Sequence, residues 1–329
     1  MRVLVTGASG FLGMQVCLHL IERGHNVRAA VRRPIKAPLE LEVFNVGDVH
    51  GSTDWVAALD SREAVIHLAA RVHVMRDLSS NPIEDFRSVN LHGTSQLAHA
   101  AIESGIARFV YLSSIKVNGD RTLERPFTPF DKPQPGDPYA ISKWETEQHL
   151  TSLSDSLGVV IIRPPLVYGP GVGGNFRRLA SLLHTGVPLP LGSITNARSM
   201  ISIWNLVDLI ELCLRHPAAR GHTFLASDGE DLSTPDLLNM LGAAIGHPAR
   251  LLPCPVPLLR RLSRAVGRDK EFSRLSDSLQ VDSSLPRNLL GWRPPQSTTS
   301  GIELTGASFR SKSLHDVQFK DSRNHRDTA

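Results

Sequence analysis

The chain has 329 residues, of which 41% are hydrophobic and 21% charged, with a formal net charge of +4. This composition is typical of a folded globular protein with one large or two modest domains. The mild basic excess suits an enzyme of anionic substrates. It forms no concentrated stripe, which argues against a nucleic-acid partner. No run of about 18 apolar residues occurs, so no membrane-spanning helix is expected.

The cysteine and histidine patterns exclude two further classes of protein. Cys17, Cys213 and Cys254 are odd in number and far apart, so free thiols in a reducing compartment are expected rather than a disulfide framework. The first strand starts at residue 2, which leaves no room for a secretory leader. These features together predict a cytoplasmic protein. The 14 histidines show no metal-ligand spacing, so no metal site is expected.

A glycine-rich turn follows the first apolar run of the chain. Residues 3–6 (VLVT) predict a buried parallel strand, and helical periodicity runs from Phe11 to Arg23. Between them, Gly7 permits a tight turn, Gly10 allows a pyrophosphate to approach the backbone, and Gly13 lets the helix pack on the strand. The helix N-terminus adds partial positive charge. Strand, glycine turn and helix in this order predict a dinucleotide site.

The first half of the chain alternates between strand and helix patterns. This alternation predicts βαβ units and a parallel sheet with right-handed crossovers. Residues 127–138 hold four prolines and predict a loop that leads into the next helix. Expected strands are 3–6, 27–31, 42–45, 64–68, 109–112 and 159–162, and expected helices include 88–104 and 139–156.

Tyr139 and Lys143 lie four residues apart on one predicted helix, so both side chains can reach one site. A tyrosine hydroxyl titrates near pH 10, and a nearby ammonium favours its ionised form. Ser113 and Ser114 stand at the end of the predicted strand 109–112. Together with the glycine turn, these residues predict a site in which a tyrosine exchanges protons at neutral pH.

These segments, taken in order, resemble the extended short-chain dehydrogenase/reductases, the nucleotide-sugar epimerase/dehydratase group. The resemblance covers residues 1–305 and implies a Rossmann-type doubly wound parallel α/β sheet with a smaller C-terminal substrate domain. Residues 1–165 would bind NAD(P), with a return near 199–227, residues 166–305 would mainly bind substrate, and a tail from Gly306 to Ala329 is expected to be disordered. The resemblance rests on residues 6–13, 67–70, 89–94, 113–114, 139–143 and 163–171.

The resemblance also implies roles for single residues. Ser114, Tyr139 and Lys143 would be the catalytic triad, with Ser114 preferred to Ser113 because it stands five residues before Gly119. Asp48 would contact the adenine, and Asn90 would have a supporting role near the nicotinamide. The implied cofactor-binding residues are Gly7, Ser9, Gly10, Phe11, Leu12, Gly13, Arg32, Asp48, Val49, Leu68, Ala69, Ala70, Asn90, Tyr139, Lys143 and Pro165.

The segment after the second predicted strand favours NADP(H), while leaving NAD(H) open. NAD enzymes tend to carry an acid there for the ribose 2′-hydroxyl, whereas a basic residue accommodates a 2′-phosphate. Here the strand ends in Arg32 and Arg33 with no acid nearby. If both arginines are only solvated loop residues, the choice of cofactor stays open.

The residues after Ser114 limit which reaction of the epimerase/dehydratase group is expected for this chain. The 4,6-dehydratases carry an acidic pair there, whereas this chain has Ile115 and Lys116, which argues against dehydration. Residues 113–119 and 67–75 resemble the UDP-4-keto-6-deoxy-N-acetylhexosamine 4-reductases of O-antigen and other surface-polysaccharide pathways. The leading prediction is therefore reduction to UDP-N-acetylquinovosamine or UDP-N-acetylfucosamine. The alternatives are a nucleotide-sugar 4-epimerase with tightly bound NAD, a reductase of lipid or phenolic ketones, and a non-catalytic NAD(P)-binding sensor.

The predicted substrate is a UDP-sugar, whose diphosphate requires basic residues. Arg198 matches the family's arginine before a hydrophobic stretch that ends in an acid, and a guanidinium binds phosphate in bidentate fashion. Asn175 and Phe176 resemble a substrate-loop pair, and Arg268 or Arg274 would supply a second cation; Ser114 would also contact the substrate.

Two further surfaces have competing interpretations. Residues 256–268 (VPLLRRLSRAVGR) form an amphipathic basic pattern that could lie on an anionic membrane, but an apolar face packed inward is the preferred interpretation, so no peripheral membrane contact is expected. The family often forms homodimers through two helices per subunit, for which residues 88–104 and 139–156 are candidates.

Overall fold

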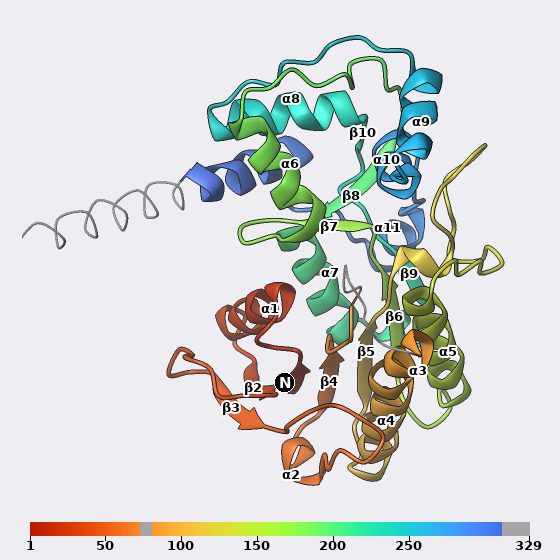
Figure 1. Ribbon diagram of the computed structural model, residues 1–329. Coiled ribbons are helices and arrows are strands. Elements are labelled where there is room, and N and C mark those ends of the chain that lie inside the picture. The colour runs from red at the N-terminus through yellow and green to blue at the C-terminus, as the bar shows by residue number, and fades with distance from the viewer. Residues whose placement is uncertain (73–80, 311–329) are drawn as a thin grey trace, which may run out of the picture.

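The computed structural model describes residues 1–72 and 81–310. Its larger half is a seven-stranded sheet in the order β3-β2-β1-β4-β5-β6-β9, with every neighbouring pair parallel (Figure 1). The predicted parallel Rossmann-type sheet is therefore confirmed. The strands are β1 (Arg2–Thr6), β2 (Asn26–Val31), β3 (Glu42–Asn45), β4 (Ala64–His67), β5 (Arg108–Leu112), β6 (Val159–Arg163) and β9 (Thr223–Leu225).

Helices cover both faces of this sheet, which is why its strands are apolar runs rather than alternating patterns. Val3 and Val5 pack with α1 (Phe11–Glu22) and α7 (Ile203–Arg215) in one core. Leu4 points to the opposite face and packs in a second core with residues of α2 (Val56–Leu59), α4 (Thr94–Glu103) and α5 (Pro138–Ser152). The helices on the two faces of the sheet together hold the ends of its strands in fixed positions.

The structure differs from the predicted helix 88–104 in the first part of this segment. The chain first forms α3 (Pro82–Arg87), then a wide π-helical turn (Ser88–Gly93), and only then α4. The π turn contains the fully buried Asn90, whose side chain donates to Arg71 O and Ser142 Oγ. Such turns commonly mark functional sites.

The smaller half has its own core around a three-stranded sheet in the order β10-β8-β7. The strands are β7 (Leu166–Tyr168), β8 (Arg198–Ser202) and β10 (Asp231–Leu232). The helices of this half are α6 (Gly174–His184), α8 (Thr234–Ile245), α9 (Val256–Ala265) and α10 (Asp269–Ser276), followed by a helical segment over 298–310.

The chain passes between the halves repeatedly. It returns to the large sheet through α7 and β9, and again through α11 (Ser284–Leu290), whose Leu290 lies in the same core as α1. Within residues 199–227, α7 packs in the core of the large sheet and β9 pairs with β6, whereas β8 pairs within the small sheet.

Two expectations about the C-terminal region are wrong. Residues 306–310 are helical, not disordered, because Gly306 allows a close approach to α8, where an added Cβ would stand 2.4 Å from Ala244 Cβ; the rest of the tail lies outside the described residues. The expected inward packing of the α9 face is wrong for three of its four residues: Leu259 packs on the core of the smaller half, but Leu258, Leu262 and Val266 are 48%, 55% and 68% exposed. None of the helices in the described ranges is long and apolar enough to span a membrane.

Candidate active site

The glycine turn between β1 and α1 has the geometry that a dinucleotide needs. Gly7 has φ +67°, and a Cβ there would stand 2.7 Å from Ala69 N. A Cβ at Gly13 would stand 2.1 Å from Gly7 O, so α1 can approach the turn only with glycine at this position. Gly10 caps α1 without any side-chain bond, and the first turn of the helix holds no acid. The turn therefore fits a pyrophosphate, with Ser9, Phe11 and Leu12 beside it.

A buried network of hydrogen bonds, which the sequence analysis did not predict, joins the glycine turn to the neighbouring strand β4. His67 Nδ1 is 2.7 Å from Thr6 Oγ1, and His67 Nε2 is 2.8 Å from Thr94 Oγ1. Thr6 Oγ1 also accepts from Leu68 N and Ala69 N at 3.2 Å. Burial lowers the pKa of His67 to about 3, so the ring stays neutral. This network of hydrogen bonds holds the loop 68–70, which was predicted to contact the cofactor, in place.

Two more predicted cofactor residues meet at the edge of β2. Arg32 Nη1 lies 3.6 Å from Asp48 Oδ1, and both side chains are largely exposed. Val49, next to Asp48, packs against the second core. Arg32, the basic group predicted to accommodate a 2′-phosphate, is therefore present. Asp48, an acid from the connection between β3 and α2, lies close to it.

Ser114 and Tyr139 are positioned by two caps. Ser114 lies just after β5, and its Oγ accepts from Lys116 N at 3.3 Å. Tyr139 is in the first turn of α5, which Asp137 caps by accepting from Ala140 N at 2.8 Å. The Lys116 ammonium pairs with Asp137, so the two segments are tied together. Burial raises the pKa of Tyr139 to about 12, opposed by hydrogen bonding to Ser114.

Lys143 lies one helical turn after Tyr139 and is buried. Its Nζ donates to Leu112 O at 2.9 Å, and lies 4.6 Å from the ring centroid of Tyr111 and 6.0 Å from that of Tyr139. Burial lowers the pKa of Lys143 to about 7, against the opposing charge of Glu147. The Lys143 ammonium donates to the carbonyl at the C-terminal end of β5, and its lowering of the Tyr139 pKa stays a prediction.

The choice of Ser114 over Ser113 has a structural reason. The Ser113 hydroxyl donates to buried Glu147, so it faces the protein interior. Arg163 Nε donates to Glu147 Oε1 at 2.9 Å, and Arg163 Nη1 donates to Asn118 Oδ1 at 2.9 Å. The sequence analysis missed this network. Its signal was a glutamate four residues after Lys143, which places both on one face of α5.

Asn90 lies against α5, where its side chain donates to Ser142 Oγ, the neighbour of Lys143. Its amide is fully buried and makes three hydrogen bonds within the protein, the third being from Arg71 N to Asn90 Oδ1 at 2.8 Å. Both amide hydrogens are used within the protein, so this side chain holds the π turn against α5 rather than donating to a cofactor. Pro165 is buried in the connection after β6, beside Pro164, whose carbonyl accepts from Ile115 N.

The predicted substrate residues are only partly brought together. Arg198 begins β8, is half-buried, and its Nη1 donates to Asp277 O at 2.9 Å. Phe176 is 1% exposed and stacks on Tyr168 with ring centroids 5.7 Å apart, so a ligand contact through its ring is wrong. The Asn175 side chain lies outside the described part of the structure. Arg268 and Arg274 are exposed at the two ends of α10.

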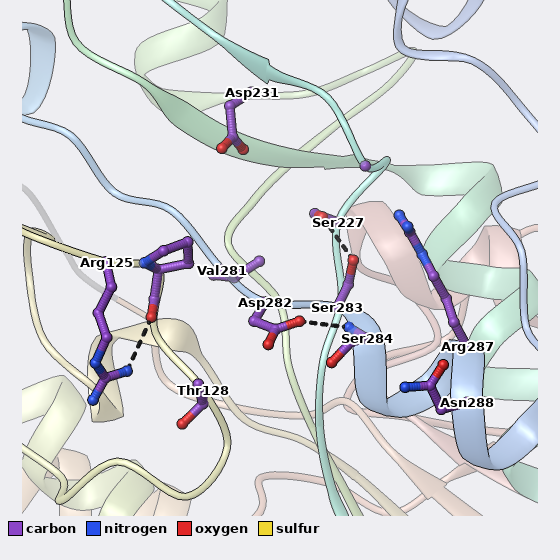
Figure 2. Close-up of a pocket in the computed structure, with 12 residues that line it drawn as sticks. Arg125, Thr128, Ser227, Asp231, Val281, Asp282, Ser283, Ser284, Arg287 and Asn288 are labelled. Carbon is purple, nitrogen blue, oxygen red and sulfur yellow. Dashed lines mark hydrogen bonds between the residues drawn. The ribbon is translucent and has the colours of Figure 1, made fainter.

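A hollow of about 550 Å³ lies beside the site rather than within it. Figure 2 shows Arg125 and Asp282, which lie on loops, and Arg287, which lies on α11, around this hollow. None of the three catalytic candidates lines it. Its wall residue Val281 packs with Ile115, the neighbour of Ser114, in a small apolar cluster. The hollow is therefore adjacent to the Ser114 segment and separated from it by this cluster.

No group of three His, Cys, Asp or Glu side chains suited to hold a metal ion is present in residues 1–72 and 81–310. Cys17, Cys213 and Cys254 are free thiols, and the first two are buried.

Comparison with known proteins identifies the family. A model of the "NAD dependent epimerase/dehydratase family" matches residues 3–226. A UDP-glucose 4-epimerase of Vibrio cholerae is 43% identical over 93% of this chain and 95% of its own. A 3-beta-hydroxysteroid dehydrogenase of Mycolicibacterium neoaurum is 31% identical over 75% of this chain and 70% of its own.

Solved structures share the fold. That of MoeE5 in complex with UDP-glucuronic acid and NAD superposes with a TM-score of 0.77 at 23% identity, covering 95% of this chain and all of the other. The family match, the full-length relative and the shared fold agree with the glycine turn and the Ser–Tyr–Lys arrangement. This chain belongs to the NAD-dependent epimerase/dehydratase family and is an NAD-dependent enzyme of the extended short-chain dehydrogenase/reductase type.

Proposed function

We propose that this enzyme is a nucleotide-sugar 4-epimerase that interconverts UDP-hexoses differing at C4. The observation that carries the proposal is the near full-length similarity, at 43% identity, to the Vibrio cholerae UDP-glucose 4-epimerase. This favours the epimerase alternative over the 4-keto-reductase that the sequence placed first. The arrangement of Ser114, Tyr139 and Lys143 at the end of β5, next to the glycine turn, suits this chemistry.

The cofactor would be held by the glycine turn, the loop 68–70 and Lys143. When bound, NAD supplies the hydride acceptor and donor for C4 and, in its oxidised form, a positive charge that favours an ionised tyrosine. Tyr139 accepts the proton of the C4 hydroxyl as hydride leaves C4, which gives a 4-keto-sugar. Ser114 donates a hydrogen bond to that carbonyl. Tyr139 returns the proton to O4 when hydride comes back to the opposite face of C4.

The reductase remains a second candidate because one observation favours it. No acid directly follows β2, and the exposed Arg32 is a basic residue in the segment where NADP enzymes tend to carry one. An NADPH-dependent reduction of a UDP-4-keto-6-deoxy-N-acetylhexosamine would use the same three residues, with Tyr139 as proton donor only. No acid directly follows Ser114, since Ile115 and Lys116 occupy those positions, which argues against dehydration.

The two candidates separate in one experiment. The purified enzyme is incubated with UDP-glucose or UDP-N-acetylglucosamine without added nicotinamide, and the products are resolved by NMR. An epimerase forms the C4 epimer with no net change in nicotinamide absorbance. Absence of the epimer, together with NADPH oxidation by the 4-keto-sugar, would overturn the epimerase proposal in favour of the reductase.

The preference between NAD and NADP is expected to depend on Arg32. Arg32→Glu replaces a cation beside the ribose by an anion, so the Kd of NADP is expected to rise about tenfold or more while that of NAD stays within about twofold. Isothermal titration of both cofactors measures the ratio. Arg121→Glu, an equal charge change at an exposed loop residue, is the control. An unchanged NADP/NAD ratio in Arg32→Glu would show that Arg32 is only a solvated partner of Asp48.

A further inference from the structure

Helix α9 carries apolar side chains both toward the protein and toward the outside. The side that faces the protein holds Val256, Leu259 and Arg260, of which the first two pack only partly on the core of the smaller half. Arg260 Nη2 donates to Asp277 Oδ1 at 2.6 Å, and its guanidinium lies 5.6 Å from the ring centroid of Phe272. An ion pair and a cation–π contact therefore hold α9 in place, and none of its residues is fully buried.

The outward side of α9 is apolar. Leu258 and Leu262 are four residues apart, and Val266 follows after another four, so the three share one face. They are 48%, 55% and 68% exposed. Large exposed side chains that stand singly are ordinary, whereas a contiguous apolar stripe indicates a binding surface. α9 lies at the outer rim of the smaller half, beside α10, as Figure 1 shows.

The charges around this stripe identify its partner. Residues 256–276 contain six arginines and lysines against two acids, an excess of four that equals the formal net charge of the whole chain. Arg261 and Arg268 are exposed beside the stripe, and Arg264 Nε lies 3.3 Å from Asp269 Oδ1. An apolar stripe flanked by arginines matches the interface of an anionic bilayer, where leucines enter the acyl boundary and guanidinium groups meet phosphates.

We propose that α9 docks this enzyme on anionic phospholipid membranes, with Leu258, Leu262 and Val266 inserted and Arg261 and Arg268 at the headgroups. This corrects the sequence-based preference for an inward-facing helix. Arg260 is not part of the membrane-facing surface, because its ion pair with Asp277 holds α9 on the smaller half. The proposal does not depend on the sugar chemistry, so either can fail without the other.

The docking face is close to the candidate diphosphate site. Asp277 accepts from Arg260 through its carboxylate and from Arg198 through its backbone carbonyl. One residue therefore connects the proposed membrane helix to the arginine predicted to bind the substrate diphosphate. Docking through α9 would hold that side of the smaller half near the bilayer surface.

The test is co-sedimentation of the full chain with vesicles of phosphatidylcholine alone and of phosphatidylcholine with phosphatidylglycerol in equal parts. We expect binding to the anionic vesicles only, weakened by high salt because the Debye length falls to about 3 Å at 1 M. Leu258→Ser with Leu262→Ser is expected to lower the partition coefficient at least about tenfold, and Arg261→Glu with Arg268→Glu by a similar factor.

Matched variants control for folding and net charge. Leu39→Ser with Leu123→Ser removes two leucines that are fully or largely exposed elsewhere, and Arg121→Glu with Lys132→Glu makes the same charge change on another surface. Both control pairs should sediment like the unaltered enzyme. No binding to anionic vesicles, equal binding to both vesicle types, or a dimer in lipid-free solution that Leu258→Ser with Leu262→Ser dissociates would overturn the proposal.

Discussion

Replacing Tyr139 with phenylalanine is expected to lower kcat for C4 interconversion about a thousandfold, with KM changed by less than about threefold. The substitution removes only the hydroxyl that exchanges a proton with O4, and general acid–base catalysis contributes a factor of about 10² to 10⁴. The ring contact with Phe86, at 6.0 Å between centroids, is retained. Substrate binding therefore persists while proton transfer fails. Steady-state kinetics by coupled assay or NMR measures both constants.

Tyr168→Phe provides the matched control for this experiment. Its hydroxyl donates to Asp228 Oδ2 at 2.6 Å in the core of the smaller half. Its loss should reduce stability without changing kcat by more than about threefold, because the hydroxyl is not among the catalytic candidates. A Tyr139→Phe enzyme that keeps most of its kcat would show that another group exchanges the proton.

Replacing Lys143 with methionine is expected to abolish activity and, at neutral pH, to increase the free energy of unfolding. The side chain is 3% exposed, and burial lowers its pKa from 10.5 to about 7. The charged form is therefore disfavoured in the folded state relative to the unfolded state. By linkage, a shift of this size corresponds to a destabilisation of about 2–4 kcal/mol at pH 7, after allowance for the lost bond to Leu112 O.

The gain in stability from Lys143→Met is expected to depend on pH in a definite direction. A base whose folded pKa lies below its unfolded pKa destabilises the protein fully below about pH 7, and the penalty disappears as pH rises toward 10.5. The gain from Lys143→Met should thus be largest at pH 7 and below, and absent above about pH 10.5. Denaturant unfolding at both ends of this range measures it. Lys132→Met, at an exposed lysine, should show no such trend, and a pH-independent gain in Lys143→Met would contradict a burial penalty.

Most of the large sheet was predictable because strands such as β1, β4 and β6 are short apolar runs separated by helical periodicity. β3 was predicted with both ends correct, and β1, β4 and β6 within one residue. The turn at Gly7 and Gly13 was predictable because only glycine satisfies the contacts there. The contacts of Gly13 are with Gly7 and Ala8, close in the chain, whereas those of Gly7 are with Leu68 and Ala69 of the loop after β4.

The features that sequence reasoning missed depend on contacts between distant segments. Asn90 is directed inward because the π turn packs against Ser142, and Phe176 because it stacks on Tyr168. The exposed face of α9 could not be distinguished from a buried one, because both have the same helical period. The ion pair of Glu147 with Arg163 joins residues of α5 and β6, which no local pattern reveals.

The repeated passage of the chain between the two halves has a mechanical consequence. Because the chain returns to the large sheet once through α7 and β9 and again through α11, several covalent connections cross the boundary between the halves. Wide hinge opening would have to bend all of them together, so the halves can shift only by small sliding motions. Neither half is a continuous stretch of chain. A single proteolytic cut therefore cannot release an independent module, and the two halves must evolve and fold as one unit.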